Sequence, residues 1–441
     1  MQSSKLIKKF APLLILNCWI AACGSGITVQ SQDAEDANDA AEGSDSPSDS
    51  DTPAAPLAAS GLTAAGTLTT ITLNWTASSS TDVTGYFVYR SEDGTSFSKI
   101  NSSAVTGTQY IDSNDAGQTA RHGIVYSYRV TAVSAAGVES VSTSSVRSLY
   151  GTRLNSFYDD KVFLMGSAAE SPFVIEGSVT INVVDDATSQ SALLIDSAHT
   201  VYVADGATLD IEKNHKLYVG GKLKVLASRD APATFTSHTN SLPLVDGDGF
   251  SIQFEDCDDS DDDTEEGSTL QNSTIENLAN NDASAIVVDN CNVNILNSKL
   301  SSNESGSSSL QFLTPKRVRI EDNEISRLGF YFMGSDFSMV GSNSSIKDNH
   351  FLDTRVQTFY IYNYTSVPFS EGQITGNHFQ GGVPITLSNY ENSGASPGAL
   401  PFESNYWAGG LPSVNGGSYG TSDYDFSPAL DSAPASAGPD W

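Results

Sequence analysis

The sequence predicts an all-β chain in which a compact stranded domain precedes a long solenoid of parallel strands. A six-fold repeat carries the main evidence: an apolar residue, an Asn or Ser three positions later, and a second apolar residue two positions after that. The copies are Leu270-Ser273-Ile275, Ile295-Ser298-Leu300, Ile320-Asn323-Ile325, Ile346-Asn349-Phe351, Ile374-Asn377-Phe379 and Phe402-Asn405-Trp407. They begin 25, 25, 26, 28 and 28 residues apart, a period typical of solenoids. Upstream, residues 57–148 alternate at period two, and the solenoid region contains no stretch of helical period.

Composition limits the function. The 441 residues carry 22 Lys and Arg against 53 Asp and Glu, a net charge of −31. A surface this acidic repels nucleic acid, so we expect no nucleic-acid partner. Only 17% of residues are charged, which fits extracellular β-structure better than a cytosolic helical enzyme.

The first 22 residues have the organisation of an export signal. Basic residues at Lys5, Lys8 and Lys9 precede an apolar stretch that is too short to span a bilayer. The stretch ends in Ile20-Ala21-Ala22-Cys23-Gly24, which resembles the lipobox of bacterial lipoproteins. That resemblance implies cleavage before Cys23, acylation of Cys23 and, with Gly24 next, delivery to the outer membrane. The alternative is an ordinary secretory signal with an incidental Cys.

Residues 23–56 predict an acidic tether. No Lys or Arg occurs from Gly24 to Pro56, and eight acidic residues lie among Ala, Ser and Pro. Such a segment buries too little apolar surface to fold, and its charges repel one another into an extended chain. We expect it to join the lipid anchor to the folded part of the protein.

Residues 57–148 predict a β-sandwich. Ile71, Leu73 and Trp75 share one strand face, and a later strand begins Tyr126-Ser-Tyr128-Arg-Val. This strand and the turn Ser134-Ala-Ala-Gly137 resemble the last two strands of a fibronectin type III domain. By the same resemblance, Trp75 is the core Trp and Tyr126 the tyrosine-corner residue.

The repeat predicts columns of equivalent residues. Each rung rises by one strand spacing, about 4.8 Å, so equivalent side chains stack. Apolar positions would form interior columns, and the Asn and Ser positions would lie between them. We expect Asn323, Asn349, Asn377 and Asn405 to form a hydrogen-bonded ladder, with Asn favoured because it tolerates the left-handed conformation of a sharp bend. Independent turn residues are the alternative.

The ladder and the phrases Asp205-Gly-Ala-Thr-Leu209 and Val219-Gly-Gly-Lys-Leu223 resemble the right-handed parallel β-helix of the pectate-lyase-like superfamily. That resemblance places a connector and N-terminal cap at residues 149–180, the β-helix at 181–410, and a C-terminal cap and tail at 411–441. The cap is expected on physical grounds too, because an open last rung exposes unpaired strand edges.

A pair of cysteines and an acidic run lie next to each other in the middle of the solenoid. Cys257 and Cys291 each lie five residues after equivalent strand positions, Ile252 and Ile286. Their Cα atoms should be about one strand spacing apart, which allows either a disulfide or two stacked thiols. An acidic run then follows Cys257. Its spacing at Asp259, Asp261 and Asp263 matches the start of a calcium loop, but Thr264 and Leu270 replace the Gly and Glu that such a loop needs. A solvated loop is the default expectation, and weak Ca²⁺ binding is the alternative; no other cofactor is expected.

The outward columns are the remaining candidates for a ligand surface. The residue after each ladder position varies freely, and Glu324, His350 and His378 would lie side by side. Such a group can bind metal or move protons, although ordinary surface is the simpler interpretation. Tyr331, Tyr360 and Tyr362 should also point outward, either as a platform for sugar rings or in packing against a loop.

No catalytic motif accompanies the fold. The polygalacturonase branch of the superfamily uses Asn-Thr-Asp, Asp-Asp, Gly-His-Gly and Arg-Ile-Lys motifs, of which only bare Asp-Asp pairs occur here. Lys316, Arg317 and Arg319 form a basic cluster without a matching carboxylate set. The sequence therefore predicts a lipid-anchored envelope protein with a structural, adhesive or glycan-contacting role and no catalytic residues, on the cell surface or facing the periplasm. A polysaccharide lyase or hydrolase acting on an acidic polysaccharide is the alternative.

Overall fold

The computed structural model describes residues 53–113, 123–165, 171–183, 191–239, 244, 248–257, 267–279, 284–303, 309–333, 344–352, 359–362, 373–380, 386–390, 400–402, 404–408, 413–414, 424–425, 429–430, 432–434 and 437–439. These residues belong to one compact unit, Pro53–Trp441. Cys23 and the acidic residues Asp259, Asp261 and Asp263 lie outside the described residues.

The first part of this unit consists of two small antiparallel sheets. Sheet A has the order β1-β2-β5 and sheet B the order β4-β3-β6-β7. Their strands are β1 (Ser60–Gly66), β2 (Thr70–Thr76), β3 (Val83–Ser91), β4 (Ser98–Lys99), β5 (Gln109–Ser113), β6 (Tyr126–Ser134) and β7 (Val146–Ser148). Alternate residues of both sheets form one buried cluster. In it the Trp75 ring packs edge-on against Tyr86, with ring centroids 5.4 Å apart.

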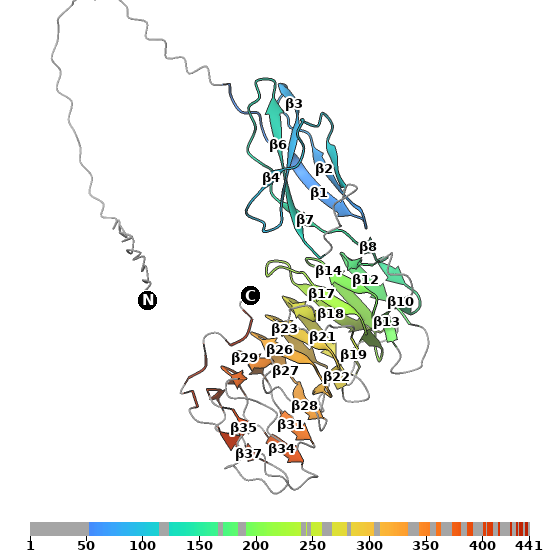
Figure 1. Cartoon of the computed structure of the whole chain (residues 1–441), viewed down its shortest axis with the longest axis vertical. Coiled ribbons are helices and arrows are strands. Elements are labelled where there is room, and N and C mark those ends of the chain that lie inside the picture. The colour runs from blue at the N-terminus through green and yellow to red at the C-terminus, as the bar shows by residue number, and fades with distance from the viewer. Residues whose placement is uncertain are drawn as a thin grey trace, which may run out of the picture. The chain divides into compact units, whose positions relative to one another are not determined.

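The second part is a solenoid of three parallel sheets, visible in Figure 1 as strands stacked in chain order from green to red. Sheet C consists of β8 (Thr152–Arg153), β11 (Phe173–Ile175), β14 (Thr200–Val203), β17 (Lys222–Val225), β20 (Ser268–Gln271), β23 (Asn292–Leu296), β26 (Arg317–Glu321), β29 (Ser345–Lys347) and β32 (Ile374–Thr375). Sheet D consists of β9 (Phe157–Tyr158), β12 (Ser178–Ile181), β15 (Thr208–Glu212), β18 (Ala233–His238), β21 (Ser273–Leu278), β24 (Lys299–Ser302), β27 (Glu324–Ser326), β30 (His350–Leu352), β33 (His378–Phe379) and β36 (Tyr406–Trp407). Sheet E consists of β10 (Val162–Leu164), β13 (Ser191–Ile195), β16 (Lys216–Val219), β19 (Ser251–Glu255), β22 (Ser284–Asp289), β25 (Ser309–Phe312), β28 (Gly329–Met333), β31 (Phe359–Tyr362), β34 (Thr386–Tyr390) and β37 (Ser413–Val414).

Each rung runs through sheets C, D and E in turn, and every strand pairs in parallel with its equivalent in the next rung. The pairing begins with β8, β9 and β10, which pair with β11, β12 and β13. Parallel stacking therefore starts near residue 152, within the segment where the sequence analysis placed a connector and cap. Short strands such as Thr152–Arg153 give little period-two signal, so sequence pattern alone does not reveal them.

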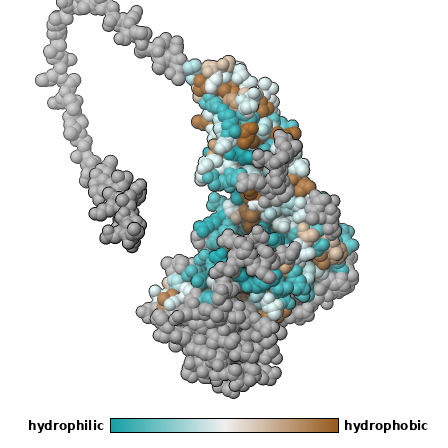
Figure 2. All heavy atoms as spheres, in the orientation of Figure 1, coloured by the Kyte–Doolittle hydropathy of each residue, from teal (hydrophilic) through white to brown (hydrophobic). Residues whose placement is uncertain are grey.

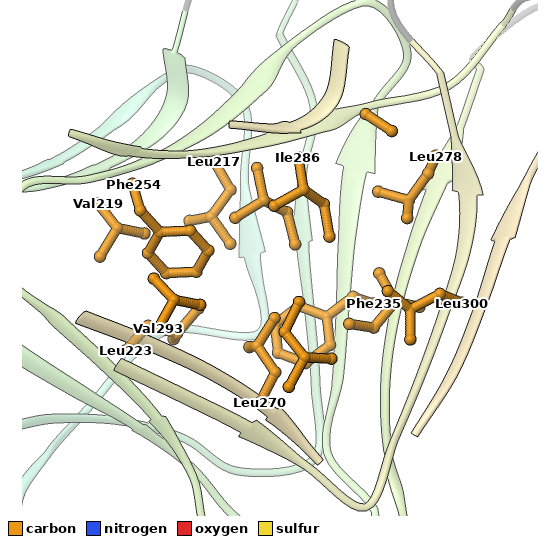
Figure 3. Packing of buried hydrophobic residues seen from close by; sticks show 14 of the residues in the cluster. Leu217, Val219, Leu223, Phe235, Phe254, Leu270, Leu278, Ile286, Val293 and Leu300 are labelled. Atoms are coloured by element: carbon orange, nitrogen blue, oxygen red, sulfur yellow. The ribbon is translucent and has the colours of Figure 1, made fainter. Parts of the chain in front are cut away.

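The interior of the solenoid is one continuous apolar core. Side chains from all three sheets converge on it, as Figure 3 shows for Leu217 and Phe254 of sheet E, Leu223 and Leu270 of sheet C, and Phe235 of sheet D. The columns expected from the repeat are present in the strand registers. Ile320 pairs with Ile346, which pairs with Ile374. On sheet D, aromatic rings stack instead: the Phe351 and Phe379 centroids are 4.6 Å apart, and those of Phe379 and Trp407 are 4.3 Å apart.

The Asn ladder lies at the corner between sheets C and D. Asn323, Asn349 and Asn377 each donate from Nδ2 to Oδ1 of the next ladder residue, over 2.9–3.0 Å. The same Oδ1 atom accepts the backbone N–H of the preceding ladder residue. All four ladder Asn are fully buried. Each amide therefore pairs buried backbone and side-chain groups that would otherwise have no partner.

The left-handed residue of each corner is not the ladder Asn but the residue before it. Positive φ angles of 47° to 71° occur at Asn272, Asn297, Asp322, Asp348, Gly376 and Ser404. The expectation that the ladder Asn adopts this conformation is wrong. Two adjacent columns therefore form each corner. The residue in the first column adopts the left-handed conformation of the bend, and the next residue supplies the hydrogen-bonding side chain. Because a left-handed L-residue costs about 1–2 kcal/mol unless it is Gly, Asn or Asp, the bend column is mostly Asn, Asp and Gly.

The last strands of sheet E keep the parallel register, with Phe359 paired to Leu387. Beyond the rungs, β35 (Leu400–Pro401) pairs with β38 (Tyr424–Asp425). The C-terminal residues return to the ladder corner, where Leu430 N donates to Asn405 O and Gly438 N to Asp348 O. In the part of the chain that the structure describes, we find no helix with the length and apolarity that a membrane crossing needs.

The ladder predicts a specific loss of stability in an Asn349→Ala variant. Asn349 accepts from the backbone and side chain of Asn323 and donates to the Ile320 carbonyl and to Asn377. Its removal leaves buried groups unpaired, at about 1–3 kcal/mol each. We expect the free energy of unfolding in urea to fall by about 3 kcal/mol or more.

Two variants control for this measurement. Asn349→Ser should be milder, because Ser298 at the equivalent position accepts the Ser273 N–H with its own hydroxyl, over 3.0 Å. His350→Ala changes the adjacent, partly exposed residue. An Asn349→Ala variant no less stable than His350→Ala would contradict the role of the ladder.

Candidate functional site

The outward column of sheet D brings the two predicted histidines together. Glu324 pairs with His350, and His350 with His378. The two imidazoles are stacked, with centroids 4.3 Å apart and planes at 7°. The Tyr406 ring follows at 5.0 Å from His378. All of these side chains are partly exposed, so the column is a short surface stack of aromatic rings.

The electrostatics of this stack favour a neutral imidazole at His378. Burial, with a smaller contribution from His350, lowers the pKa of His378 below its ordinary value. The Nε2 atom of His350 lies 2.8 Å from Oε1 of Gln380, and the amide oxygen accepts the proton of that nitrogen. Among the described residues, no group of three or more His, Cys, Asp or Glu side chains is arranged to hold a metal ion. Glu324 thus does not complete a metal site with the two histidines.

The outward column of sheet E combines aromatic, amide and aliphatic residues. It includes the predicted Tyr331, which is partly exposed, and Gln311. In the strand register Tyr331 pairs with Tyr360. The side chains of Tyr360 and Tyr362 lie outside the described residues. Followed back along the solenoid, the same column comprises Phe163, Leu194, Tyr218, Gln253, Val287 and Gln311. Phe163, in the first rung, is 54% exposed.

The earlier members of this column were missed in the sequence analysis, although period-two alternation was present there. Leu193-Leu194-Ile195 and Leu217-Tyr218-Val219 each place one residue outward between two buried ones. Without the strand registers, nothing in the sequence aligned them with Tyr331. Figure 2 shows that apolar residues on the visible described surface form separate brown patches rather than one continuous area.

Cys257 and Cys291 form a disulfide, with Cα atoms 5.0 Å apart. Both residues are buried, and they follow the paired strands β19 and β22. The bridge ties two neighbouring rungs together where the chain leaves for the acidic run. The Cys291 Sγ atom also accepts the backbone N–H of Cys257, over 3.2 Å.

A cluster on sheet D went unrecognised in the sequence. The imidazole of His238 lies between two carboxylates of the preceding rung: Nδ1 is 2.9 Å from Asp210 Oδ1, and Nε2 is 3.4 Å from Glu212 Oε2. An ionised carboxylate can only accept hydrogen bonds. A neutral imidazole that donates to Asp210 through Nδ1 has no proton on Nε2, and only the doubly protonated ring places an N–H toward each carboxylate. The geometry therefore favours the protonated imidazole. We call the side chains of Asp210, Glu212 and His238 the clamp.

The surroundings of this clamp agree with that conclusion. Hydrogen bonding to Asp210 raises the pKa of His238, against the opposing effect of burial, and both carboxylates add to the rise. Burial raises the pKa of Glu212, although His238, His215 and Lys213 oppose the rise. Lys213 is held by Asp248, with Nζ 3.0 Å from either carboxylate oxygen.

The clamp could not be found from spacing alone. Glu212 and His238 are opposite each other in the register of β15 and β18, but they belong to the early rungs, which lack the six-fold phrase. Residues two apart on a strand share a face, which applies to Asp210 and Glu212 of β15. This alternation does not identify the strand that lies next to that face.

The basic cluster does not join the histidines. Arg317 lies on sheet C and is only 6% exposed. Arg319, on the same strand, binds Glu321 over 2.7 Å. His350 and His378 lie on sheet D. The basic and imidazole groups considered for a lyase therefore occupy different faces of the solenoid.

A protein-family model matches part of the solenoid. A family model described as a right handed beta helix region matches residues 245–394. The solenoid is a right-handed β-helix. This handedness is also the one that a parallel crossover connection takes almost without exception. A comparison with curated proteins found no match to this chain.

Several solved structures are similar to parts of the chain. A pectate lyase from Erwinia chrysanthemi, in complex with tetragalacturonic acid, is 12% identical, with 81% of this chain and 88% of that chain covered and a TM-score of 0.18. A family 28 exopolygalacturonase from Yersinia enterocolitica is 12% identical, with 85% and 98% covered and a TM-score of 0.17. An Fn3-like protein from Clostridium thermocellum is 31% identical, with 22% of this chain and 97% of that chain covered and a TM-score of 0.18.

The clamp predicts a pH dependence of stability. The pKa of His238 is raised in the folded state, so its stabilising effect is complete below the ordinary His pKa and is lost as pH rises through the folded value. The raised pKa of Glu212 acts in the same direction. We expect His238→Gln to lower the free energy of unfolding by about 1–2 kcal/mol at mildly acidic pH, and by less at alkaline pH.

His378→Gln provides a matched control of opposite sign. The lowered pKa of His378 means that its neutral form is favoured by folding, so its contribution is lost as pH falls below the ordinary His value. Thermal unfolding of both variants across mildly acidic to alkaline pH measures the two slopes. Parallel pH profiles for wild type and His238→Gln would show that folding does not favour the protonated form of His238.

Proposed function

We propose that this protein is a lipid-anchored component of a bacterial cell envelope whose β-helix contacts glycans without catalysing their cleavage. One observation carries the proposal, namely the aligned outward column of sheet E. Its members, in order, are Phe163, Leu194, Tyr218, Gln253, Val287, Gln311 and Tyr331, so three aromatic rings and two amides share it with two aliphatic side chains. Aromatic rings offer an apolar face on which the C–H groups of a sugar ring can pack, and amides bind its hydroxyls.

The regular spacing of the column supports a polymeric ligand. Successive outward residues are about 4.8 Å apart along the solenoid axis. A sugar chain laid along this axis meets one side chain per rung, so many weak contacts add up along its length. A rigid scaffold holds these contacts in place, which limits the entropy lost on binding.

The N-terminal sequence supports envelope anchoring. The export signal at residues 1–22 ends just before Cys23, and Cys23 begins the acidic segment that runs to residue 56. Two or more acyl chains on one residue hold a protein stably on a membrane. The outer membrane is the proposed location, with the folded part held away from the lipid by the tether.

We further infer that residues 57–148 form a fibronectin type III domain. The three-stranded and four-stranded antiparallel sheets, with orders β1-β2-β5 and β4-β3-β6-β7, support this inference, as does the buried Trp75 against Tyr86. In this arrangement the domain is a spacer between the tether and the β-helix. A purely structural role for this domain fits its single buried cluster, to which both sheets contribute.

The glycan proposal is tested by binding of the purified full chain to a panel of neutral and acidic polysaccharides. We expect retention on at least one of them, and about tenfold weaker binding for each of Tyr218→Ala and Tyr331→Ala, equivalent to about 1.4 kcal/mol. Thr274→Ala, which changes an outward residue of sheet D, should bind as the wild type does.

The same panel tests for catalysis. We expect no change in polymer length or unsaturation after prolonged incubation, with or without Ca²⁺. Turnover that disappears in Arg317→Ala or His350→Ala would favour a polysaccharide lyase or hydrolase and overturn the non-catalytic proposal.

Anchoring is tested separately by Cys23→Ala. The variant should leave the membrane fraction and appear in the soluble fraction, because the acyl chains have no other attachment residue in this proposal. Metabolic labelling with a fatty acid should mark the wild type alone. Continued membrane association of an unlabelled variant would rule out the lipid anchor at Cys23.

A further inference from the structure

The link between the antiparallel sheets and the β-helix is buried. We call residues 57–148, with sheets A and B and their shared core, the antiparallel region. Three residues, Leu149, Tyr150 and Gly151, separate strand β7 from strand β8, and all three are buried. Boundaries between folded parts of a chain usually fall in exposed, flexible linkers that few contacts cross. A buried link is an exception that calls for a physical reason.

Each residue of the link is held by a different partner. Tyr150 belongs to the core of the antiparallel region, where its ring lies edge-on to that of Tyr126, with centroids 5.8 Å apart. Leu149 lies in a separate buried cluster together with residues of the β-helix. The backbone N–H of Gly151 donates to the carbonyl of Thr67, in the turn between β1 and β2, over 2.9 Å. A segment that is fixed at three consecutive residues does not act as a hinge.

The cluster around Leu149 joins the antiparallel region to sheet C. We call Leu149, Val174 and Tyr202, with the partly buried Ala204 and Leu226 packed against them, the seam cluster. Val174 and Tyr202 occupy outward positions of β11 and β14, because the residues on either side of them belong to the interior core. Outward side chains of a solenoid normally face solvent, yet Val174 is 0% and Tyr202 only 8% exposed.

The outward column of sheet C changes its residue types where the seam cluster lies. In register order its described members are Arg153, Val174, Tyr202, Lys224, Thr269, Asn294, Arg319 and Ser345. Val174 and Tyr202 are the apolar and aromatic members of this column, and every other member is polar or charged. The residues of the β-helix are therefore suited to a contact at these two rungs.

Two glycines allow the two parts to approach each other closely. A Cβ atom at Gly123, which has a left-handed φ of 80°, would overlap the hydroxyl of Tyr202. A Cβ atom at Gly151 would overlap Cγ2 of Val174. Any larger residue at either position would push a side chain of the seam cluster away.

Polar contacts add to the seam cluster. Arg147 of β7 donates to Asp205 of the β-helix over 2.6 Å. Arg153 of β8 donates to the carbonyl of Leu149 over 2.9 Å and pairs with Glu176. Exposed ion pairs contribute little in water, and the Arg147 and Asp205 side chains are 36% and 26% exposed. The apolar seam cluster therefore makes the larger contribution to the contact.

We propose that the antiparallel region and the first rungs of the β-helix form one cooperative unit rather than two domains joined by a hinge. Separation of the two parts would expose Val174, Tyr202 and Leu149 to water, at a cost in hydrophobic free energy. In a solenoid each rung is stabilised by its neighbours, so the first rungs gain from a cover that later rungs do not need. The inference goes beyond the proposed function and does not depend on glycan binding.

The test follows the unfolding of the purified full chain in urea by hydrogen exchange resolved by segment. Amides of β6, in the antiparallel region, and of β14, in the first rungs, should lose protection at the same urea concentration. The reason is that the residues of one cooperative unit open together.

Tyr202→Ser removes the largest side chain of the seam cluster. We expect the urea midpoints of β6 and β14 to separate by about 1 M or more in this variant. Tyr218→Ser is the matched control, because Tyr218 is an outward residue of β16 on sheet E and is not part of the seam cluster. It should leave the two midpoints equal.

Gly123→Ala and Gly137→Ala form a second matched pair, which tests the proposal even if Tyr202→Ser does not fold. The two glycines have φ angles of 80° and 78°, so both variants carry the same backbone strain. A Cβ atom at Gly123 meets Tyr202, whereas nothing lies within 4 Å of one at Gly137. We expect separated midpoints in Gly123→Ala and equal midpoints in Gly137→Ala.

Two results would overturn the proposal. The first is a wild-type chain in which β6 and β14 lose protection at different urea concentrations. The second is equal midpoints for β6 and β14 in Gly123→Ala and in any folded Tyr202→Ser variant, which would show that the seam cluster does not couple the two parts.

Discussion

The hydrogen bonding between successive rungs is the constraint on which the rest of this structure depends. Parallel pairing holds each residue about 4.8 Å from its equivalent in the next rung. A polar group buried at one position thus meets the same kind of group above and below. The Asn ladder uses this repetition: Asn323, Asn349, Asn377 and Asn405 each satisfy a neighbour's amide and backbone within a fully buried corner. A single apolar residue in this column would leave two rungs with unpaired groups.

The same constraint separates the inside of the solenoid from its outer faces. Interior columns are fixed by packing and by the ladder, so their residue types repeat from rung to rung. Outward columns repeat only in position, and the residue types that they carry differ from one sheet to another. Sheet D carries the His238 clamp and the His350–His378 stack, sheet E the column of aromatic, amide and aliphatic residues, and sheet C the buried pair Val174 and Tyr202. A β-helix can in this way present different surfaces without changing its core.

The sequence allowed the interior to be predicted more completely than the surfaces. The six-fold phrase placed the apolar columns and the ladder, and the equal offsets of Cys257 and Cys291 placed the two residues of the disulfide next to each other. It also aligned His350 with His378. The clamp of His238 by Asp210 and Glu212 was not predictable, because the early rungs lack the phrase and their loops vary in length. The left-handed corner residue was assigned one position too late, since both columns are rich in polar residues.

By itself, then, the sequence determined the all-β class, the solenoid period, the interior columns and the net charge of the chain. Each of these follows from local periodicity or from composition. The tertiary structure decided which outward residues become neighbours: which carboxylates meet His238, which residues precede Tyr331 in its column, and that Val174 and Tyr202 of sheet C meet Leu149. The physical reason is that neighbours across rungs are joined by strand register, and register depends on the length of the intervening loops and on backbone pairing. A residue's position along the chain specifies which way its side chain points, but only the stacked rungs specify what it points alongside.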